Sequence, residues 1–148
     1  MTIRLARPEE APALAAVVER AYASWVPVVG QRPFPMQDDY AARVAAGQAW
    51  VLEADGALRG LVVIETHPDH LMLYNVAVDP ACQGTGDGRT LLDFVEAEAV
   101  RRGLPEVRLY TNVLMERNIA VYAARGYAET GRRAEKGFAQ VFMAKRVG

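Results

Sequence analysis

Hydrophobic residues along the chain follow two periods that alternate from one end to the other. Apolar side chains three or four positions apart, as between Leu14 and Val18, predict amphipathic helices. Short apolar runs bounded by Gly, Pro, Asp or Asn predict strands. The strands expected on this basis are 3–6, 50–54, 58–66, 71–78, 107–112, 127–133 and 138–145.

Four helices are expected between these strands. The first opens at Pro8-Glu9-Glu10, where proline and acids favour a helix start, and continues to Trp25. The others are a helix over 36–46, one with a buried stripe from Leu91 to Ala99, and one over 115–125; residues 27–35 are expected as a loop.

The order of these elements, βααβββαβαββ, predicts a mixed α/β fold. An antiparallel N-terminal part, with a hairpin at Asp55-Gly56, precedes a strand–helix–strand crossover. The strand over 71–78 is apolar on both faces and is expected at the centre of the sheet. The predicted fold is a mostly antiparallel sheet of about seven strands flanked by four helices.

Composition narrows the class of protein. The 148 residues fit one domain, 1–148, without repeats or linkers, and are 51% hydrophobic. The net charge of −1 gives no footprint for nucleic acid, and no apolar run is long enough to span a membrane. The first six residues do not look like a signal peptide, and the single cysteine, Cys82, offers neither a disulfide nor a metal site. We expect a cytoplasmic protein without a metal.

The most informative segment is a glycine-rich loop between the strand over 71–78 and the next helix. Glycines at 84, 86 and 88 leave backbone N–H groups uncovered at a helix start, where phosphate groups bind. A dinucleotide fold would need a third glycine where Arg89 stands, and a P-loop would need a lysine. A tight turn without a ligand is the other alternative, although such a turn would not need three glycines.

Two segments resemble motifs of the GNAT superfamily of N-acyltransferases. The first is Gln83-x-x-Gly86-x-Gly88, preceded by Val78-Asp79-Pro80 and followed by Arg89. The second runs from Asn118 to Tyr127 and is similar to the later family helix that carries a Tyr and ends at Gly. The spacing of the segments and the element order also match, so the resemblance covers essentially the whole chain. It implies a GNAT-like fold and acetyl-CoA as cosubstrate.

The resemblance also implies roles for individual residues. Tyr122 matches the general acid that protonates the departing CoA thiolate, although its ring also suits a core position. A backbone N–H near Val76 would polarise the thioester carbonyl. The pantetheine arm would pair with residues 76–78 as an added strand, so residues 107–112 should diverge from them. The implied cofactor-binding residues are Val76, Ala77, Val78, Gln83, Gly84, Thr85, Gly86, Asp87, Gly88, Arg89 and Asn118.

Three positions depart from the family pattern. Asp87 puts an acid inside the proposed pyrophosphate loop, and we expect it to turn away and help cap the helix. Met115 stands where relatives more usually carry asparagine. The remaining candidate for a contact to the pantetheine arm is therefore Asn118. No general base is evident, because the positions where relatives carry glutamate are neutral. The candidates are Glu65, Asn75 or Tyr74 acting through water, or bulk solvent.

The acceptor is expected to be a primary amine of a small molecule or peptide. Candidate acceptor-binding residues are Trp25, Phe34, Met36, Tyr74 and Asn75, although aromatic residues at helical spacing are also typical of a core. Asp38 and Asp39 hint at a cationic amine.

The leading hypothesis is direct acetyl transfer in a ternary complex by an N-acetyltransferase, which the family resemblance also suggests is a homodimer. One alternative is a CoA-binding sensor with little turnover, which Asp87 and the missing base favour. The other is an interaction domain that binds no CoA.

Overall fold

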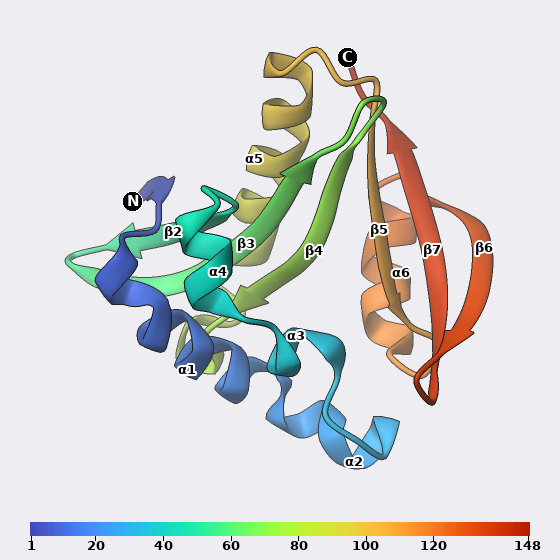
Figure 1. Ribbon diagram of the computed structural model, residues 1–148, viewed down its shortest axis with the longest axis horizontal. Coiled ribbons are helices and arrows are strands. Elements are labelled where there is room, and N and C mark those ends of the chain that lie inside the picture. The colour runs from blue at the N-terminus through green and yellow to red at the C-terminus, as the bar shows by residue number, and fades with distance from the viewer.

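A single seven-stranded sheet organises the computed structural model, which describes residues 1–148 (Figure 1). The strand order is β1-β2-β3-β4-β5-β7-β6, and only β4 and β5 run parallel. The strands are β1 (Thr2–Leu5), β2 (Ala49–Ala54), β3 (Ala57–Thr66), β4 (Leu71–Val78), β5 (Glu106–Asn112), β6 (Ala128–Glu135) and β7 (Phe138–Arg146). The helices are α1 (Ala11–Tyr22), α2 (Val26–Val29), α3 (Phe34–Gln37), α4 (Tyr40–Ala45), α5 (Asp87–Arg101) and α6 (Glu116–Ala124).

Two hydrophobic clusters lie on the two faces of the sheet. One contains the buried stripe of α5, including Leu91 and Val95, together with Tyr122 of α6 and residues of β2 to β5 and β7. The other contains the apolar stripe of α1, with Leu14 and Val18, and residues of α4, β2 and β3. The helical periods of the sequence therefore identify the faces that pack on the sheet.

The mixed, mostly antiparallel sheet confirms the predicted fold class. The hairpin at Asp55-Gly56 is also confirmed: both residues have positive φ, as a two-residue hairpin turn requires. The continuous helix expected over 36–46 is wrong, because the backbone is extended at Asp38 and the Asp39 carboxylate caps α4 by accepting from the Ala42 N–H. The expected loop over 27–35 contains most of α2 and the start of α3.

The sheet is split between β4 and β5. These two strands are paired at one end and separate from each other towards the side of α2 and α3 (Figure 1). Their pairing stops at Leu73 and Leu109, so Tyr74–Val78 has no partner on that side. The pairing of β3 with β4 shifts at the same level, where Tyr74 is an extra residue. Such a bulge increases the local twist and bends the strand. The predicted gap between residues 76–78 and the strand over 107–112 is thus confirmed, although residues 107–109 themselves pair with the start of β4.

No helix of the protein has both the length and the apolar character needed to cross a membrane.

Candidate functional site

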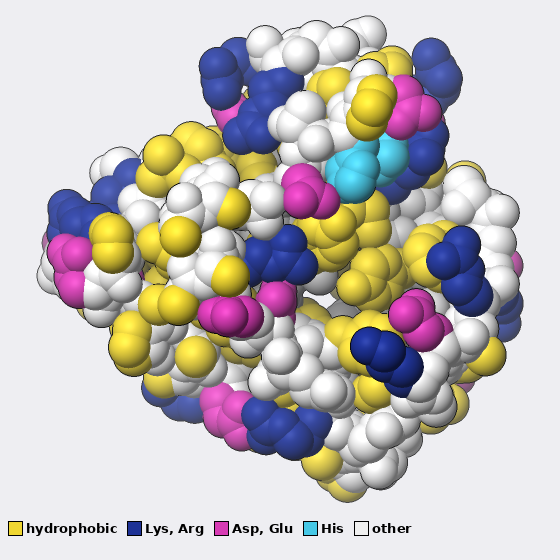
Figure 2. Space-filling model, in the orientation of Figure 1, with side chains coloured by type: hydrophobic (Ala, Val, Ile, Leu, Met, Phe, Trp, Pro, Cys, Tyr) yellow, Lys and Arg dark blue, Asp and Glu magenta, His cyan; other side chains and the backbone are white.

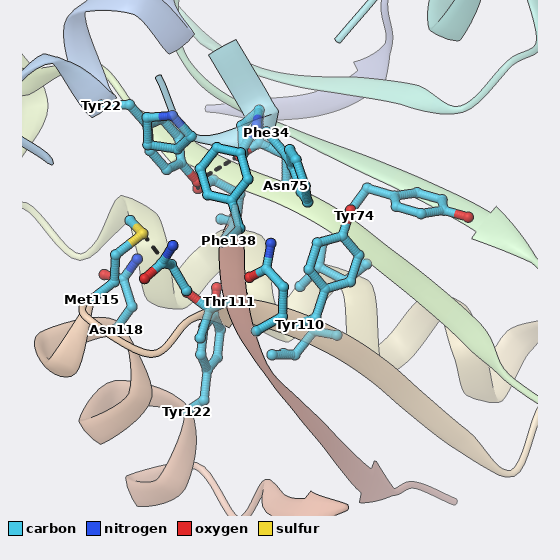
Figure 3. A pocket seen from close by; sticks show the side chains of 17 residues that line it. Tyr22, Phe34, Tyr74, Asn75, Tyr110, Thr111, Met115, Asn118, Tyr122 and Phe138 are labelled. Atoms are coloured by element: carbon cyan, nitrogen blue, oxygen red, sulfur yellow. Dashed lines mark hydrogen bonds between the residues drawn. The ribbon is translucent and has the colours of Figure 1, made fainter. Parts of the chain in front are cut away.

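A cavity occupies the gap between β4 and β5 (Figure 3). Seventeen residues line it, from α1, the segment 33–35, β4, β5, α6 and β7. Two open grooves adjoin the cavity at Val76 and Asn118. One lies along α5 and α6 past Gly88 and Arg89, and the other lies beside Trp25 and Gln83. The arrangement joins one partly enclosed chamber to a surface that leads to the glycine-rich loop.

The glycine-rich loop presents six consecutive N–H groups that have no acceptor in the protein. No backbone or side-chain acceptor takes a hydrogen bond from the N–H groups of residues 84–89, whereas Thr90 N–H already donates to the Gly86 carbonyl. Gly84 and Gly86 have φ of 82° and 85°, which favours glycine, and a Cβ at either would project into open space. These N–H groups and the start of α5 suit an anionic group such as pyrophosphate.

Asp87 lies beneath this loop and is 2% exposed. Its Oδ2 accepts a hydrogen bond from Arg59 Nε at 2.8 Å, and the same guanidinium donates from Nη2 to Thr85 Oγ1 at 3.2 Å. The Asp87 side chain is thus turned inward, towards Arg59. The expected capping is wrong: Gly86 is the N-cap, and no side chain caps α5. The nearby positive charge of Arg59, which the sequence analysis missed, engages the carboxylate instead.

The free edge of β4 offers backbone groups to the gap. Asp79 N–H donates to the Arg59 carbonyl on the β3 side at 2.8 Å. Because N–H groups alternate in direction along a strand, those of Val78 and Val76 face the gap. The side chain of Ala77 packs in the hydrophobic cluster under α1.

Tyr122 reaches from α6 into the chamber, and its residue is 9% exposed (Figure 3). The phenol donates to no protein group, and its ring meets that of Tyr127 edge-on at 5.8 Å. Burial raises the pKa of Tyr122 to about 12, so its proton is retained throughout the neutral range. Tyr122 therefore combines a core position with a free donor at the junction of chamber and groove.

Asn118 lines the chamber and both grooves, and its side chain has no hydrogen-bond partner in the protein. Met115 is buried, and its sulfur lies 3.9 Å from Thr111 Oγ1. Arg89 and Gln83 are exposed at the grooves, where Arg89 has no ion-pair partner. The amide available to a ligand on this helix is thus that of Asn118.

Asn75 belongs to a hydrogen-bonded network and is 4% exposed. Its Oδ1 accepts from the Tyr22 hydroxyl at 2.7 Å, and its Nδ2 donates to the Tyr40 hydroxyl at 3.1 Å. Tyr40 in turn donates to the Pro35 carbonyl. Both ends of the amide are therefore occupied, and Asn75 is not available to act as a base.

Tyr74 and Glu65 form a second polar pair. The Tyr74 hydroxyl donates to Glu65 Oε1 at 2.8 Å, which lowers the pKa of Glu65. Burial and this hydrogen bond raise the pKa of Tyr74 to about 12. The Tyr74 ring extends away from the centre of the chamber (Figure 3). Neither residue is poised to take a proton at neutral pH.

The predicted acceptor residues divide into two groups. Phe34, Tyr74 and Asn75 line the chamber, and the Phe34 ring packs on Phe138 of β7 at 4.3 Å. Trp25 lies in the groove near Gln83 instead, with the Arg117 guanidinium 5.3 Å from its ring centre. Met36 packs against the cluster under α1 and does not line the chamber.

Asp38 and Asp39, which suggested a cationic amine, do not offer a free carboxylate for one. Asp38 Oδ2 accepts from Arg43 Nε at 2.9 Å, and Asp39 caps α4. Hydrophobic side chains gather around a hollow on the face shown in Figure 2, with charged side chains at its rim. A shallow mouth adjoins the chamber at Phe34, Tyr74 and Tyr110, and Asp38, Arg43 and Lys136 also line it.

Gly86→Ala is expected to weaken binding of a pyrophosphate ligand by about tenfold, because the methyl group covers the N–H groups that charge-assisted hydrogen bonds need. Its positive φ also costs about 1 kcal/mol of stability. Gly103→Ala at the other end of α5 is the matched control, since Gly103 has φ +73° and open space beyond it. Calorimetric titration with CoA measures both variants. Equal CoA affinity in the two variants would contradict a ligand at this loop.

The model of the Acetyltransferase (GNAT) family matches residues 14–127. The chain belongs to this family.

Curated relatives match over part of their length. A mycothiol acetyltransferase of Thermomonospora curvata is 35% identical over 79 residues, which are 53% of this chain and 27% of that protein. The ribosomal-protein-bS18-alanine N-acetyltransferase of Escherichia coli is 31% identical over 78 residues, 53% of each chain. The matches thus cover about half or less of the relatives' length.

Solved structures share the whole fold. A GCN5-related N-acetyltransferase from Rhodopseudomonas palustris superposes with a TM-score of 0.81 at 24% identity, covering 99% of this chain and 95% of that one. The PaiA N-acetyltransferase from Thermoplasma acidophilum in complex with coenzyme A gives a TM-score of 0.77 at 18% identity, covering 98% of each chain. At these identities the likeness concerns the fold.

Proposed function

We propose that the protein transfers an acetyl group from acetyl-CoA to a primary amine by direct attack in a ternary complex. One observation carries this proposal: a glycine-rich loop with six unpaired N–H groups leads directly to the unpaired edge of β4 beside a buried, unpartnered tyrosine. Family membership and a relative solved with coenzyme A support the same ligand.

Each part of the site has a role in this proposal. The N–H groups of residues 84–89 hold the pyrophosphate, with Arg89 at the groove as an added positive charge. The edge at Val76 and Val78 pairs with the pantetheine arm, and Asn118 contacts it. The N–H of Val76 stabilises negative charge on the thioester oxygen. Tyr122 gives its proton to the departing sulfur.

A CoA-binding sensor with little turnover is the second candidate. The observation that favours it is the lack of an available base: Asn75 is fully hydrogen-bonded, and the pKa of Glu65 is lowered. A sensor would bind acetyl-CoA without releasing CoA in the presence of amines.

Two measurements test these functions. Acetyl-CoA at 100 times its Kd is expected to add about 2.7 kcal/mol of stability, or a shift in Tm of roughly 8 °C. Thiol release with a panel of amines then separates enzyme from sensor. Absence of a thermal shift at millimolar acetyl-CoA would rule out both, and a shift without thiol release from any amine would favour the sensor. The homodimer and the cytoplasmic location stay predictions.

A further inference from the structure

The chamber has an unusual electrostatic character for a site that would receive an amine. Its seventeen lining residues include no Asp, Glu, Lys, Arg or His. Burial raises the pKa values of its tyrosines at 22, 110 and 122, so these phenols are neutral as well.

Charged groups lie at the mouth of the chamber or behind its walls. Asp38, Arg43 and Lys136 line the mouth. Glu65 lies behind Tyr74, the Arg133 guanidinium stands 5.0 Å from the Phe142 ring centre, and Glu135 acts on Tyr110 from the hairpin between β6 and β7. An ammonium ion inside the chamber would meet no counter-charge, and burial of an unpaired ion is costly.

One wall of the chamber carries a buried polar atom that has no hydrogen-bond partner. Gln140 of β7 is 4% exposed and lines the chamber, and its Oε1 is buried without a hydrogen-bond donor. The residue paired with Gln140 on β5 is Asn112, and the Asn112 Oδ1 accepts a hydrogen bond from the Leu114 N–H. Buried amide oxygens normally have a partner, so Gln140 Oε1 is a place for an N–H that arrives with a ligand.

We propose that the acceptor presents to this chamber an uncharged amino group of low basicity, carried on an apolar or aromatic molecule, with its N–H donating to Gln140 Oε1. The acceptor class is an α-amino group next to a carbonyl, as in amino-acid amides and peptide N-termini, and not a lysine-like alkylamine. The inference rests on the proposed acetyl transfer. The chamber has about 40 Å³ of free space, which suits the amino group, and the rings of Phe34 and Tyr110, which also line the mouth, supply apolar surface for the rest of the acceptor.

Proton balance explains why such an acceptor needs no separate base. When the neutral nitrogen attacks the thioester carbon, the C–N bond forms, the C–S bond breaks, and the sulfur takes a proton from Tyr122. The nitrogen releases one of its two protons, which restores the Tyr122 phenol directly or through water. A neutral amine and a thioester therefore give an amide and a thiol without net proton release. An ammonium ion would have to lose one more proton first.

Phenylalaninamide and phenethylamine form a matched pair of acceptors, because they share the ring and differ by the carboxamide. An α-amino group titrates near pH ~7.7–8.0 and an alkylamine near ~10. We expect kcat/KM at pH 7 to be at least about tenfold higher for phenylalaninamide and to level off near pH 8. For phenethylamine it should rise about tenfold per pH unit from pH 6.5 to 9. A flat profile for phenethylamine, or its preference at pH 7, would overturn the inference.

Two variants of Gln140 test the contact itself. Gln140→Met keeps the size but removes the acceptor oxygen, and should raise KM for phenylalaninamide about tenfold with an unchanged Kd for CoA. Gln140→Glu adds a carboxylate that attracts an ammonium ion and takes its proton, so it should raise phenethylamine use relative to phenylalaninamide by about tenfold. Thermal unfolding checks that both variants fold. An unchanged KM in Gln140→Met would overturn the contact, whether or not Gln140→Glu folds.

The outcomes also separate this inference from the proposed function. Acetylation of phenethylamine with a flat pH profile would preserve the acetyltransferase and overturn the neutral-amine site. No thiol release from either amine or from the wider panel would overturn both.

Discussion

Tyr122→Phe is expected to lower kcat by about 10²-fold or more, the range that a positioned general acid contributes. The ring should keep its place in the core, since the Tyr122 hydroxyl makes no hydrogen bond in the protein. The Kd for CoA should therefore stay within about twofold of the wild-type value. Steady-state thiol release and calorimetric titration measure the two quantities.

Tyr127→Phe is the matched control, because it also removes one hydroxyl from the same aromatic pair. The Tyr127 hydroxyl donates to Glu96 Oε2 at 3.0 Å, so its loss should cost about 1 kcal/mol of stability and leave kcat largely unchanged. The pH profile gives a second check. With a pKa of about 12, Tyr122 keeps its proton below that value, so kcat should not fall between pH 8 and 10 through loss of the acid. A Tyr122→Phe variant with more than half of the wild-type kcat would show that the sulfur leaves without this proton.

Arg59→Met is expected to destabilise the protein by about 2–3 kcal/mol, because it leaves the Asp87 carboxylate buried without a counter-charge. The side chain of Asp87 is 1% exposed, and its second oxygen already lacks a partner. The substitution also removes the hydrogen bond to Thr85, so acetyl-CoA affinity should fall with stability. Chemical denaturation and CoA titration measure the two effects.

The controls for Arg59 use a second ion pair near the same loop. Arg20 pairs with Asp79 at 2.6 Å but is 53% exposed, so Arg20→Met should cost no more than about 1 kcal/mol. Adding Asp87→Asn to Arg59→Met should recover at least half of the lost stability, because the amide carries no charge to bury. Equal losses in Arg59→Met and Arg20→Met would mean that the Asp87 pair does not anchor the loop.

The parts of the fold that the sequence predicted correctly depend on local patterns. The stripes of α1 and α5 and the turn at Asp55-Gly56 follow from spacing and backbone preference within a few residues. The gap beside Val76 was predicted from the family resemblance, since a strand-like ligand needs an open edge. The loop at residues 84–89 was also predictable, because glycines mark uncovered N–H groups.

The features of the site that could not be predicted from the sequence depend on contacts between distant segments. Arg59 lies 28 positions before Asp87, and no local pattern pairs them. Gln140 stands on β7 between Ala139, which is exposed, and Val141, which is buried, so no alternation marks it as a buried polar residue; it lines the chamber together with Phe34 and residues of β5. Asn75 was considered as a base because its partners, Tyr22 and Tyr40, meet it only after α1 and α4 pack on the sheet.

The register between β4 and β5 also bears on self-association. A sheet edge with unpaired N–H and C=O groups is normally a template for strands of other molecules. Here two such edges, at Tyr74–Val78 and Tyr110–Asn112, face each other within one chain and spread apart like a wedge (Figure 1). A strand entering the wedge could keep the ~4.8 Å spacing to one edge but not to both along its length. The gap therefore suits one extended ligand, such as a pantetheine arm, paired with a single edge. It disfavours the strand pairing between chains that leads to fibrils.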